Sequence, residues 1–281
     1  AKVLFGTKLI FVSYDLYPEV ATVTNTLREG NIICRLMNHI NRCVFRRADA
    51  VVALSSEMKA FILKNREISE EKITVIPNWY EDRGEPCRDL TDNRFRDAAG
   101  KFVVSYFGNM GTMQDMDTIL GAIRELKDEG NVFFLFAGHG NKMEKLKQIV
   151  AEEAISNIVI HDFLHGKDFR DALDISDCAL VSLEQGATGL CVPSKTYSYM
   201  MQGIPLLAIM DEGDIVRDIE NGAGLWVRNG ESQKLAASIR TLRDDPEKQK
   251  TMRQTCRRIY LEKYTTDICT QKYVTLFRHL L

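Results

Sequence analysis

The stretch from Asp177 to Pro205 decides how the chain can fold. It begins with a short apolar strand, Cys178-Ala179-Leu180-Val181, continues through a loop that contains glycine, and ends with Pro193-Ser194-Lys195-Thr196-Tyr197 and the residues after it. Proline suits the first turn of a helix or the positions just before it, and serine can cap the free amides there, so Pro193-Ser194 predicts a helix start. Gly203 and Pro205 should end this helix after about two turns.

The amino end of this short helix is a candidate anion site. Its free N–H groups carry a partial positive charge, and Lys195 adds a full charge beside them. The sequence therefore predicts a phosphate at Ser194 and Lys195.

On both sides of this stretch, apolar strands alternate with helical stretches. Strands are expected at residues 8–13, 50–54, 72–76, 102–107, 132–137, 158–160, 178–181, 206–209 and 224–227. Helices are expected at residues 32–48, 56–64, 115–127, 142–152, 167–175, 195–202, 214–221, 232–243, 246–263 and 265–281. Such alternation is typical of βαβ units with parallel strands.

The strands form two series, because the polar segment 80–100 reads as a connection between domains. The predicted fold class is α/β, with two Rossmann-like doubly wound domains, the first of them incomplete. We expect a first domain at residues 1–84 and a second at 85–264, with the last helix, 265–281, packing back on the first. A cleft between two such domains is the natural place for a ligand.

Composition excludes several classes of partner. The chain has 281 residues, of which 45% are hydrophobic and 27% charged, and its net charge of −2 gives no global attraction to nucleic acid. Its seven cysteines include no CxxC pair and no zinc-like spacing, so we expect reduced thiols, no metal and a cytoplasmic protein. A weak peripheral contact of Arg42, Arg46 and Arg47 with the inner face of a membrane stays an open alternative to a solvated helix face.

Short motifs along nearly the whole chain resemble one family, the family-4 (group 1) retaining glycosyltransferases of the GT-B fold, in particular those of bacterial polysaccharide assembly. The motifs keep the family's order, and they are YDLYPE (14–19), RADAVVALS (47–55), KITVIPNW (72–79), FGNMG (107–111), FAGHG (136–140), PSKTYSYM (193–200) and GIP (203–205).

The resemblance implies that a sugar of the hexosyl or N-acetylhexosaminyl type moves, with retention, from a nucleotide diphosphate sugar to a saccharide or lipid-linked acceptor. No further cofactor is implied. Catalytic roles would fall to Asp15 from the first domain and to Glu184, which would contact the ribose or the sugar. The base would lie near Phe163 and Leu164. The remaining donor contacts would come from Gly108, Asn109, Gly111, Ser194, Lys195, Thr196 and Ser198.

The sequence departs from the family's pattern in two places. Leu190 and Ser198 stand where many members carry two glutamates, which leaves Glu184 as the nearby acid. The first strands and the acceptor loop of the family are also missing, so the chain looks shortened at its amino terminus. Two alternatives therefore stay open, a donor-binding protein or fragment without chemistry and a nucleotide-sugar epimerase.

Overall fold

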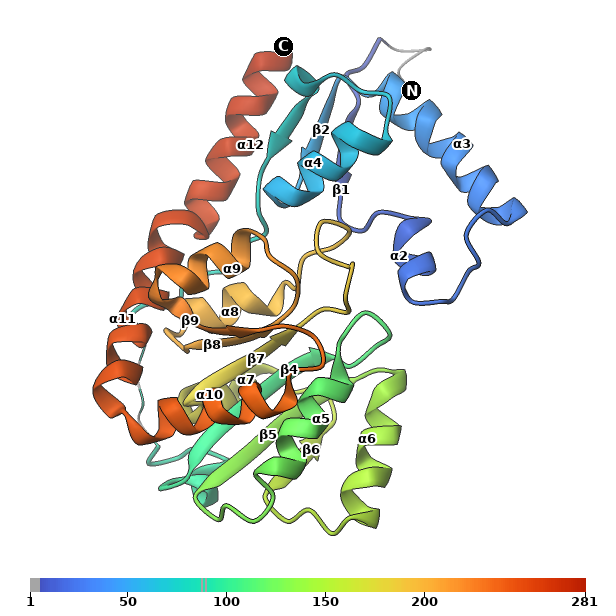
Figure 1. The fold of residues 1–281 in the computed structure, drawn as a ribbon. Helices are drawn as coiled ribbons and strands as arrows, with labels where there is room; N and C mark the ends of the chain where they lie inside the picture. Colours follow the sequence, from blue (N-terminus) through green and yellow to red (C-terminus); the bar gives the residue numbers. More distant parts are fainter. Residues whose placement is uncertain (1–5, 87, 89) are drawn as a thin grey trace.

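Two parallel β-sheets, each covered by helices, make up the protein (Figure 1). The computed structural model describes residues 6–86, 88 and 90–281. The sequence prediction of an α/β fold with two Rossmann-like units is confirmed.

The first unit has three parallel strands in the order β1-β2-β3. Its elements are β1 (Ile10–Ser13), α2 (Glu19–Val23), α3 (Ile32–Arg47), β2 (Ala50–Ala53), α4 (Ser56–Asn65) and β3 (Ile73–Val75). All four residues of β2 are buried, as expected for a central strand covered on both faces.

The second unit has six parallel strands in the order β6-β5-β4-β7-β8-β9. The strands are β4 (Phe102–Asn109), β5 (Val132–His139), β6 (Ile158–His161), β7 (Cys178–Ser182), β8 (Leu206–Ile209) and β9 (Gly224–Val227). The helices are α5 (Met116–Glu125), α6 (Asn141–Glu152), α7 (Gly166–Ile175), α8 (Lys195–Met201), α9 (Asp214–Asp218), α10 (Ser232–Asp244) and α11 (Pro246–Lys263).

This strand order places a switch point between β4 and β7. The chain runs from β4 outward through β5 to β6, then returns to β7 on the other side of β4 and continues outward to β9. In open α/β sheets the two sets of connections diverge at such a point and leave a crevice beyond the carboxyl ends of the strands. The ends of β4 and β7, at Asn109 and Ser182, are therefore where topology alone locates a site.

The helices cover both faces of the second sheet. Helices α5, α6 and α10 contribute to one apolar core, and α7, α8, α9 and α11 to the core on the opposite face. The last helix, α12 (Thr266–Leu280), instead runs alongside the first sheet, where Cys269 and Leu276 pack on Ala50 and Val52 (Figure 1). The domain boundary near residue 84 stays a prediction.

The loop between β7 and α8 connects the two units. The backbone amide of Leu16 donates to the carbonyl oxygen of Leu190 over 2.9 Å, and both side chains belong to the core of the first unit. Next to this contact, the Ser56 amide donates to the Asp214 carboxylate over 2.6 Å. The loop and α9 thus hold the second unit against α4 of the first.

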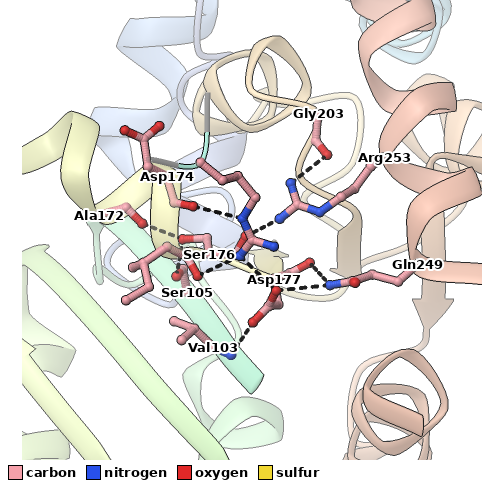
Figure 2. A network of polar contacts seen from close by, with 11 residues as sticks. Val103, Ser105, Ala172, Asp174, Ser176, Asp177, Gly203, Gln249 and Arg253 are labelled. Atoms are coloured by element: carbon pink, nitrogen blue, oxygen red, sulfur yellow. Dashed lines mark hydrogen bonds and ion pairs between the residues drawn. The ribbon is translucent and has the colours of Figure 1, made fainter. Parts of the chain in front are cut away.

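A polar network centres on Asp177, just before β7 (Figure 2). Its carboxylate accepts hydrogen bonds from the Val103 amide at 2.9 Å, from the Arg88 guanidinium at 2.9 Å and from the Gln249 amide at 3.2 Å. Arg253 donates to the backbone of Ser176 and Gly203. The network joins the interdomain connection and α11 to the amino end of β7. It therefore lies at the ends of the strands opposite those that form the switch-point crevice.

Two local predictions need correction, and one helix was not predicted. The chain forms the short helix α2 from Glu19 onward, where the sequence analysis expected no helix. Ser194 does not cap α8 with its side chain, because it already has helical backbone angles, φ −60° and ψ −23°. Beyond α9 the chain continues in a π-helical turn, Ile219–Ala223, around Gly222 rather than ending as a simple helix.

Six cysteines in the described part of the chain are free thiols, and Cys87 lies outside it. Within the same residues, no helix is long and apolar enough to cross a membrane.

Candidate active site

The switch point opens into a cleft of about 660 Å³, which we call the main cleft. The second unit contributes the loops after β4, β6 and β7, and the first unit contributes Asp15, which follows β1. The structure brings together on its walls most of the residues predicted as contacts, namely Asp15, Gly108, Asn109, Phe163, Leu164, Ser194, Lys195 and Ser198.

Lys195 lies on the floor of the main cleft, beside the end of β4. Its amine is 3.4 Å from the centre of the Tyr106 ring and 3.5 Å from the carbonyl oxygen of Asn109. No carboxylate in the described residues lies within ion-pairing distance of it. Loss of hydration lowers the pKa of Lys195 well below its usual value. An amine in this position gains strongly from an anion that enters the cleft.

Two aromatic residues hold Lys195 in place. Tyr106, fully buried under the amine, donates its hydroxyl proton to the Asn109 carbonyl oxygen at 2.8 Å. Tyr199, on the same helix as Lys195, accepts a hydrogen bond from the Phe107 amide at 2.7 Å. This bond fixes α8 against β4, so the position of the amine is set by rigid elements.

Gly108 has a backbone conformation that favours glycine, and it lies beside the Lys195 side chain. Its φ of +116° lies in the region that favours glycine, and a Cβ atom there would lie 3.5 Å from Cε of Lys195. Gly111, the other glycine of the turn, leaves space for Asn109, because a Cβ atom at Gly111 would lie 2.9 Å from the Asn109 side-chain nitrogen. The two glycines thus shape the turn, and their contact with a phosphate stays a prediction.

The residues around Lys195 on α8 differ in their exposure. Ser194, at the amino end of α8, is exposed. Thr196 is buried and does not line the main cleft. Ser198 lines the cleft, but its hydroxyl donates to the Lys195 carbonyl oxygen at 2.8 Å and so turns back onto the helix. Of the three, Ser194 is the one placed to meet a ligand directly.

Phe163 and Leu164 form one wall of the main cleft beyond β6. Phe163 is 49% exposed and lies between two imidazoles, with ring centroids 5.8 Å from His139 and 4.8 Å from His165. An exposed ring held by neighbours is a flat apolar surface on which a nucleobase can stack.

Asp15 stands on the opposite side of the main cleft, on the first unit. Although solvent reaches its side chain, the surrounding walls remove part of its hydration and raise the pKa of Asp15. Asp15 also lines a second hollow of about 410 Å³, which we call the side pocket. The two cavities share Asp15, Asn109 and Met113.

Glu184 lines neither cavity. It forms an ion pair with Lys142 at 2.5 Å, and Lys142 also donates to the Gln114 carbonyl oxygen at 2.6 Å. Glu184 therefore holds the start of α6 against the loop after β7, and its predicted contact with ribose or sugar stays a prediction.

Sequence reasoning missed several residues of the main cleft. Tyr106 lies under Lys195, and Trp79, Tyr80 and Arg83 line the wall that the interdomain connection provides. Tyr80 is held by a hydrogen bond of 2.7 Å from the Tyr260 hydroxyl to its carbonyl oxygen. The signal available was the aromatic pair Trp79-Tyr80, which follows the strand β3 after three residues and immediately precedes the polar residues of the interdomain connection.

The described residues do not provide a set of side chains suited to binding a metal ion. No group of three or more His, Cys, Asp or Glu side chains that could hold a metal ion occurs among residues 6–86, 88 and 90–281.

Two facing Rossmann-like units with a cleft at the switch point define a protein of the GT-B fold. The family model described as "Glycosyl transferases group 1" matches residues 101–245, and the chain belongs to this family. The sequence prediction of the family is thereby confirmed at this level.

Individual relatives agree with this assignment. The chain is 29% identical over 223 residues to the probable glycosyltransferase WbjE of Pseudomonas aeruginosa, covering 78% of this chain and 55% of WbjE. It is 22% identical over 180 residues to WcaI of Escherichia coli, a putative colanic acid biosynthesis glycosyl transferase, covering 62% of this chain and 44% of WcaI. The chain thus spans about half the length of these relatives.

Solved structures share the fold at low sequence identity. HepE of Anabaena, crystallised with UDP and glucose, has a TM-score of 0.78 and 18% identity over 99% of this chain and 73% of HepE. Sucrose-phosphate synthase of Thermosynechococcus elongatus has a TM-score of 0.80 and 14% identity over 99% of this chain and 69% of that enzyme.

Proposed function

We propose that the protein transfers a sugar, with retention, from a nucleotide diphosphate sugar bound in the main cleft to a saccharide or lipid-linked acceptor. The observation that carries the proposal is the Lys195 amine, which faces the main cleft at the switch point and has no carboxylate partner in the described residues. The proposed donor carries a hexosyl or N-acetylhexosaminyl group.

The chemistry of this transfer fits the cleft. When the bond to the sugar breaks, negative charge grows on the diphosphate while the sugar becomes positively charged in part. A cation fixed in advance beside the diphosphate stabilises this transition state more than the ground state. Lys195 would supply that charge, Ser194 a hydrogen bond, and Phe163 a surface for the base.

Relatives support the proposal without deciding its details. HepE was crystallised with UDP and glucose, and WcaI is named for colanic acid, a polysaccharide. By analogy we propose a role in bacterial polysaccharide assembly for this protein.

Titration with UDP-, GDP- and ADP-sugars tests the proposal. We expect one of these nucleotides to bind saturably and to protect the Lys195 amine from modification, because the diphosphate should pair with it. Calorimetry and product analysis with and without an acceptor are the measurements. If none of the donors binds, the proposed function is wrong. Release of an isomerised nucleotide sugar without acceptor would indicate an epimerase instead.

Asp15 should set the acid limit of activity. We propose that its carboxylate accepts a hydrogen bond from the attacking hydroxyl group, which only the ionised form can do well. Because the pKa of Asp15 is raised, the ionised form is lost as the pH falls through a value above that of an ordinary aspartate. Asp15→Asn should lower kcat by about 10- to 10²-fold and remove this limit from the pH profile.

Asp117→Asn is the matched control, since Asp117 is an acid on the surface with an 82% exposed side chain. It should leave the rate and the pH profile unchanged. An unaltered acid limit in the Asp15→Asn variant would show that another group titrates.

A donor-binding protein without chemistry remains the alternative that one observation favours. Ser198, where many family members carry a glutamate, points its hydroxyl back to the helix and offers no carboxylate to the cleft. Donor binding without turnover on any acceptor would support this alternative.

Location in the cytoplasm and a peripheral membrane contact stay predictions. The exposed face of α3 combines the apolar residues Ile32, Ile33, Leu36 and Ile40 with Arg42 and Arg46. This combination is one that an anionic lipid surface attracts.

A further inference from the structure

The Asp15 side chain reaches the main cleft without a contact that holds it. Among the described residues, none forms a hydrogen bond or an ion pair with its carboxylate. A side chain without such contacts is placed mainly by its backbone. The position of the carboxylate therefore depends on what holds the segment from Asp15 to Glu19.

The start of this segment is held by the second unit and by the core of the first. The amide of Leu16 donates to the carbonyl oxygen of Leu190 at 2.9 Å, and the Leu16 side chain is only 3% exposed. Leu190 lies in the loop that leads to Lys195. This contact ties the residue after Asp15 to the segment that carries the amine on the other side of the cleft.

The end of the segment is held by two residues of the first unit. Arg66 forms an ion pair with Glu19 at 2.7 Å and donates to the Tyr17 carbonyl oxygen at 3.4 Å. Asn41, on α3, donates to the same oxygen at 2.6 Å. The backbone that follows Asp15 is thus attached at Tyr17 and again at Glu19.

Arg66 is itself held rigidly. It directly follows α4, its side chain is 4% exposed, and its guanidinium carbon lies 5.9 Å from the ring centres of both Phe45 and Phe61. A flat guanidinium can contact aromatic rings while its N–H groups donate to a carboxylate and a carbonyl oxygen, which an ammonium does less well. Arg66 lines neither the main cleft nor the side pocket, so any effect on a ligand there must pass through the segment.

We infer that Arg66, together with Asn41, is a positioning residue for the transfer, because it holds the segment that places the Asp15 carboxylate across the cleft from Lys195. The inference rests on the proposed function, in which this carboxylate accepts a hydrogen bond from the attacking hydroxyl group. Misplacement of a reacting group by about 1 Å can lower the rate by up to about 10²-fold.

Replacement of Arg66 by lysine and of Asn41 by alanine tests the inference. Lysine keeps a charge for Glu19 but loses the flat group, and alanine removes the hydrogen bond to Tyr17 from a half-buried position on α3. We expect kcat to fall by about 10-fold in Arg66→Lys and by about 3-fold in Asn41→Ala. The KM for the donor should not change, because its proposed contacts lie on the second unit. Steady-state kinetics, corrected for the fraction of protein that binds donor in calorimetry, measures both constants.

Combination with Asp15→Asn distinguishes positioning from a general loss of folding. A residue that acts through the Asp15 carboxylate should have no further effect on kcat once that carboxylate is absent, whereas the effects of two independent changes multiply. Arg66→Lys in the Asp15→Asn background should therefore show the kcat of Asp15→Asn alone.

Arg243→Lys and Asn65→Ala are the matched controls. Arg243 is another partly buried arginine paired with a glutamate, Glu129, but it lies on α10 and does not line the cleft. Asn65 precedes Arg66 on α4 and lines neither cavity. Both variants should keep the kcat of the unsubstituted protein.

The inference is overturned if Arg66→Lys and Asn41→Ala keep full kcat, or if either variant lowers kcat as much in the Asp15→Asn background as without it. If Arg66→Lys does not fold, Asn41→Ala decides by the same criteria. An unsubstituted protein that binds donor but transfers its sugar to no acceptor would overturn the proposed function, and this inference with it.

Discussion

Replacement of Lys195 by methionine should lower kcat/KM by about 10²- to 10³-fold while the protein remains folded. The expected size is that of losing one preorganised group that stabilises transition-state charge. Methionine keeps the length of the side chain and can fill the space between Gly108 and the Tyr106 ring. Steady-state kinetics with the preferred donor measures the loss.

The free energy of unfolding of Lys195→Met should rise or stay unchanged, although its activity falls. The folded state holds an amine without a carboxylate partner where it loses hydration, and methionine removes that cost. Loss of the contact between the amine and the Tyr106 ring offsets part of this gain. Thermal unfolding of Lys195→Met should therefore occur at or above the temperature of the unmodified protein. Such a separation of activity from stability is what a functional lysine predicts and a structural one does not.

Lys145→Met is the matched control, because Lys145 is 69% exposed on α6 and makes only a distant ion pair with Asp117. It should change neither rate nor stability. Parallel loss of folding and activity in Lys195→Met would count against a role for Lys195 in charge stabilisation, and full activity would exclude it.

The fold could be predicted from the sequence because its strands are apolar and because glycine- or proline-containing segments mark where strands and helices end. The strand at Cys178-Ala179-Leu180-Val181 ends in a glycine-containing loop, and α8 ends before Gly203 and Pro205, as expected. Each βα unit carries its own limits in this way. The position of the cleft then followed from topology, since ligands bind at a switch point.

The side-chain arrangement could not be predicted to the same depth. The contact of Glu184 with the ligand stays a prediction, and the ion pair that it forms with Lys142, 42 residues away in sequence, was not expected. Ser198 is predicted to contact the nucleotide sugar, and it does line the main cleft. Its hydroxyl group, however, donates a hydrogen bond to the Lys195 carbonyl oxygen on the same helix. The Glu184 pair depends on which residues the tertiary fold brings together, and spacing along the chain contains no record of that. The Ser198 bond is local, because a serine in a helix can donate to the carbonyl oxygen three residues earlier, and the sequence prediction did not include that competition.

The surroundings of Lys195 illustrate the same limit. A lysine beside a helix start predicts a charge for an anion, and the structure places Lys195 at the cleft. That its amine lies on the Tyr106 ring depends on β4 and α8 being neighbours, which the hydrogen bond between Phe107 and Tyr199 secures. A residue such as Tyr106 reads as an ordinary buried strand residue until that contact is known.

Replacement of Asp177 by alanine should destabilise the protein by about 2–4 kcal/mol, the cost of removing a largely buried carboxylate and leaving the groups that donate to it without a partner. The Asp177 carboxylate accepts from the Val103 amide, from Arg88 and from Gln249, and only 14% of its side chain is exposed (Figure 2). Burial, with Arg88 nearby, already lowers the pKa of Arg253 to about 10, and loss of Asp177 would remove its compensating charge. Urea unfolding measures the change.

Glu262→Ala is the control for this prediction, because Glu262 forms an exposed pair with Arg258 one helical turn away and should contribute about 0.5 kcal/mol or less. An Asp177→Ala effect no larger than that would show that the network in Figure 2 adds nothing to stability. Asp177 precedes β7, at the end of the strand opposite the cleft, so the folded fraction of Asp177→Ala should keep its kcat. Its behaviour is then the reverse of that of Lys195→Met: one variant loses stability and keeps chemistry, and the other keeps stability and loses chemistry. Together the two variants separate the part of the second unit that holds the sheet together from the part that acts on a ligand.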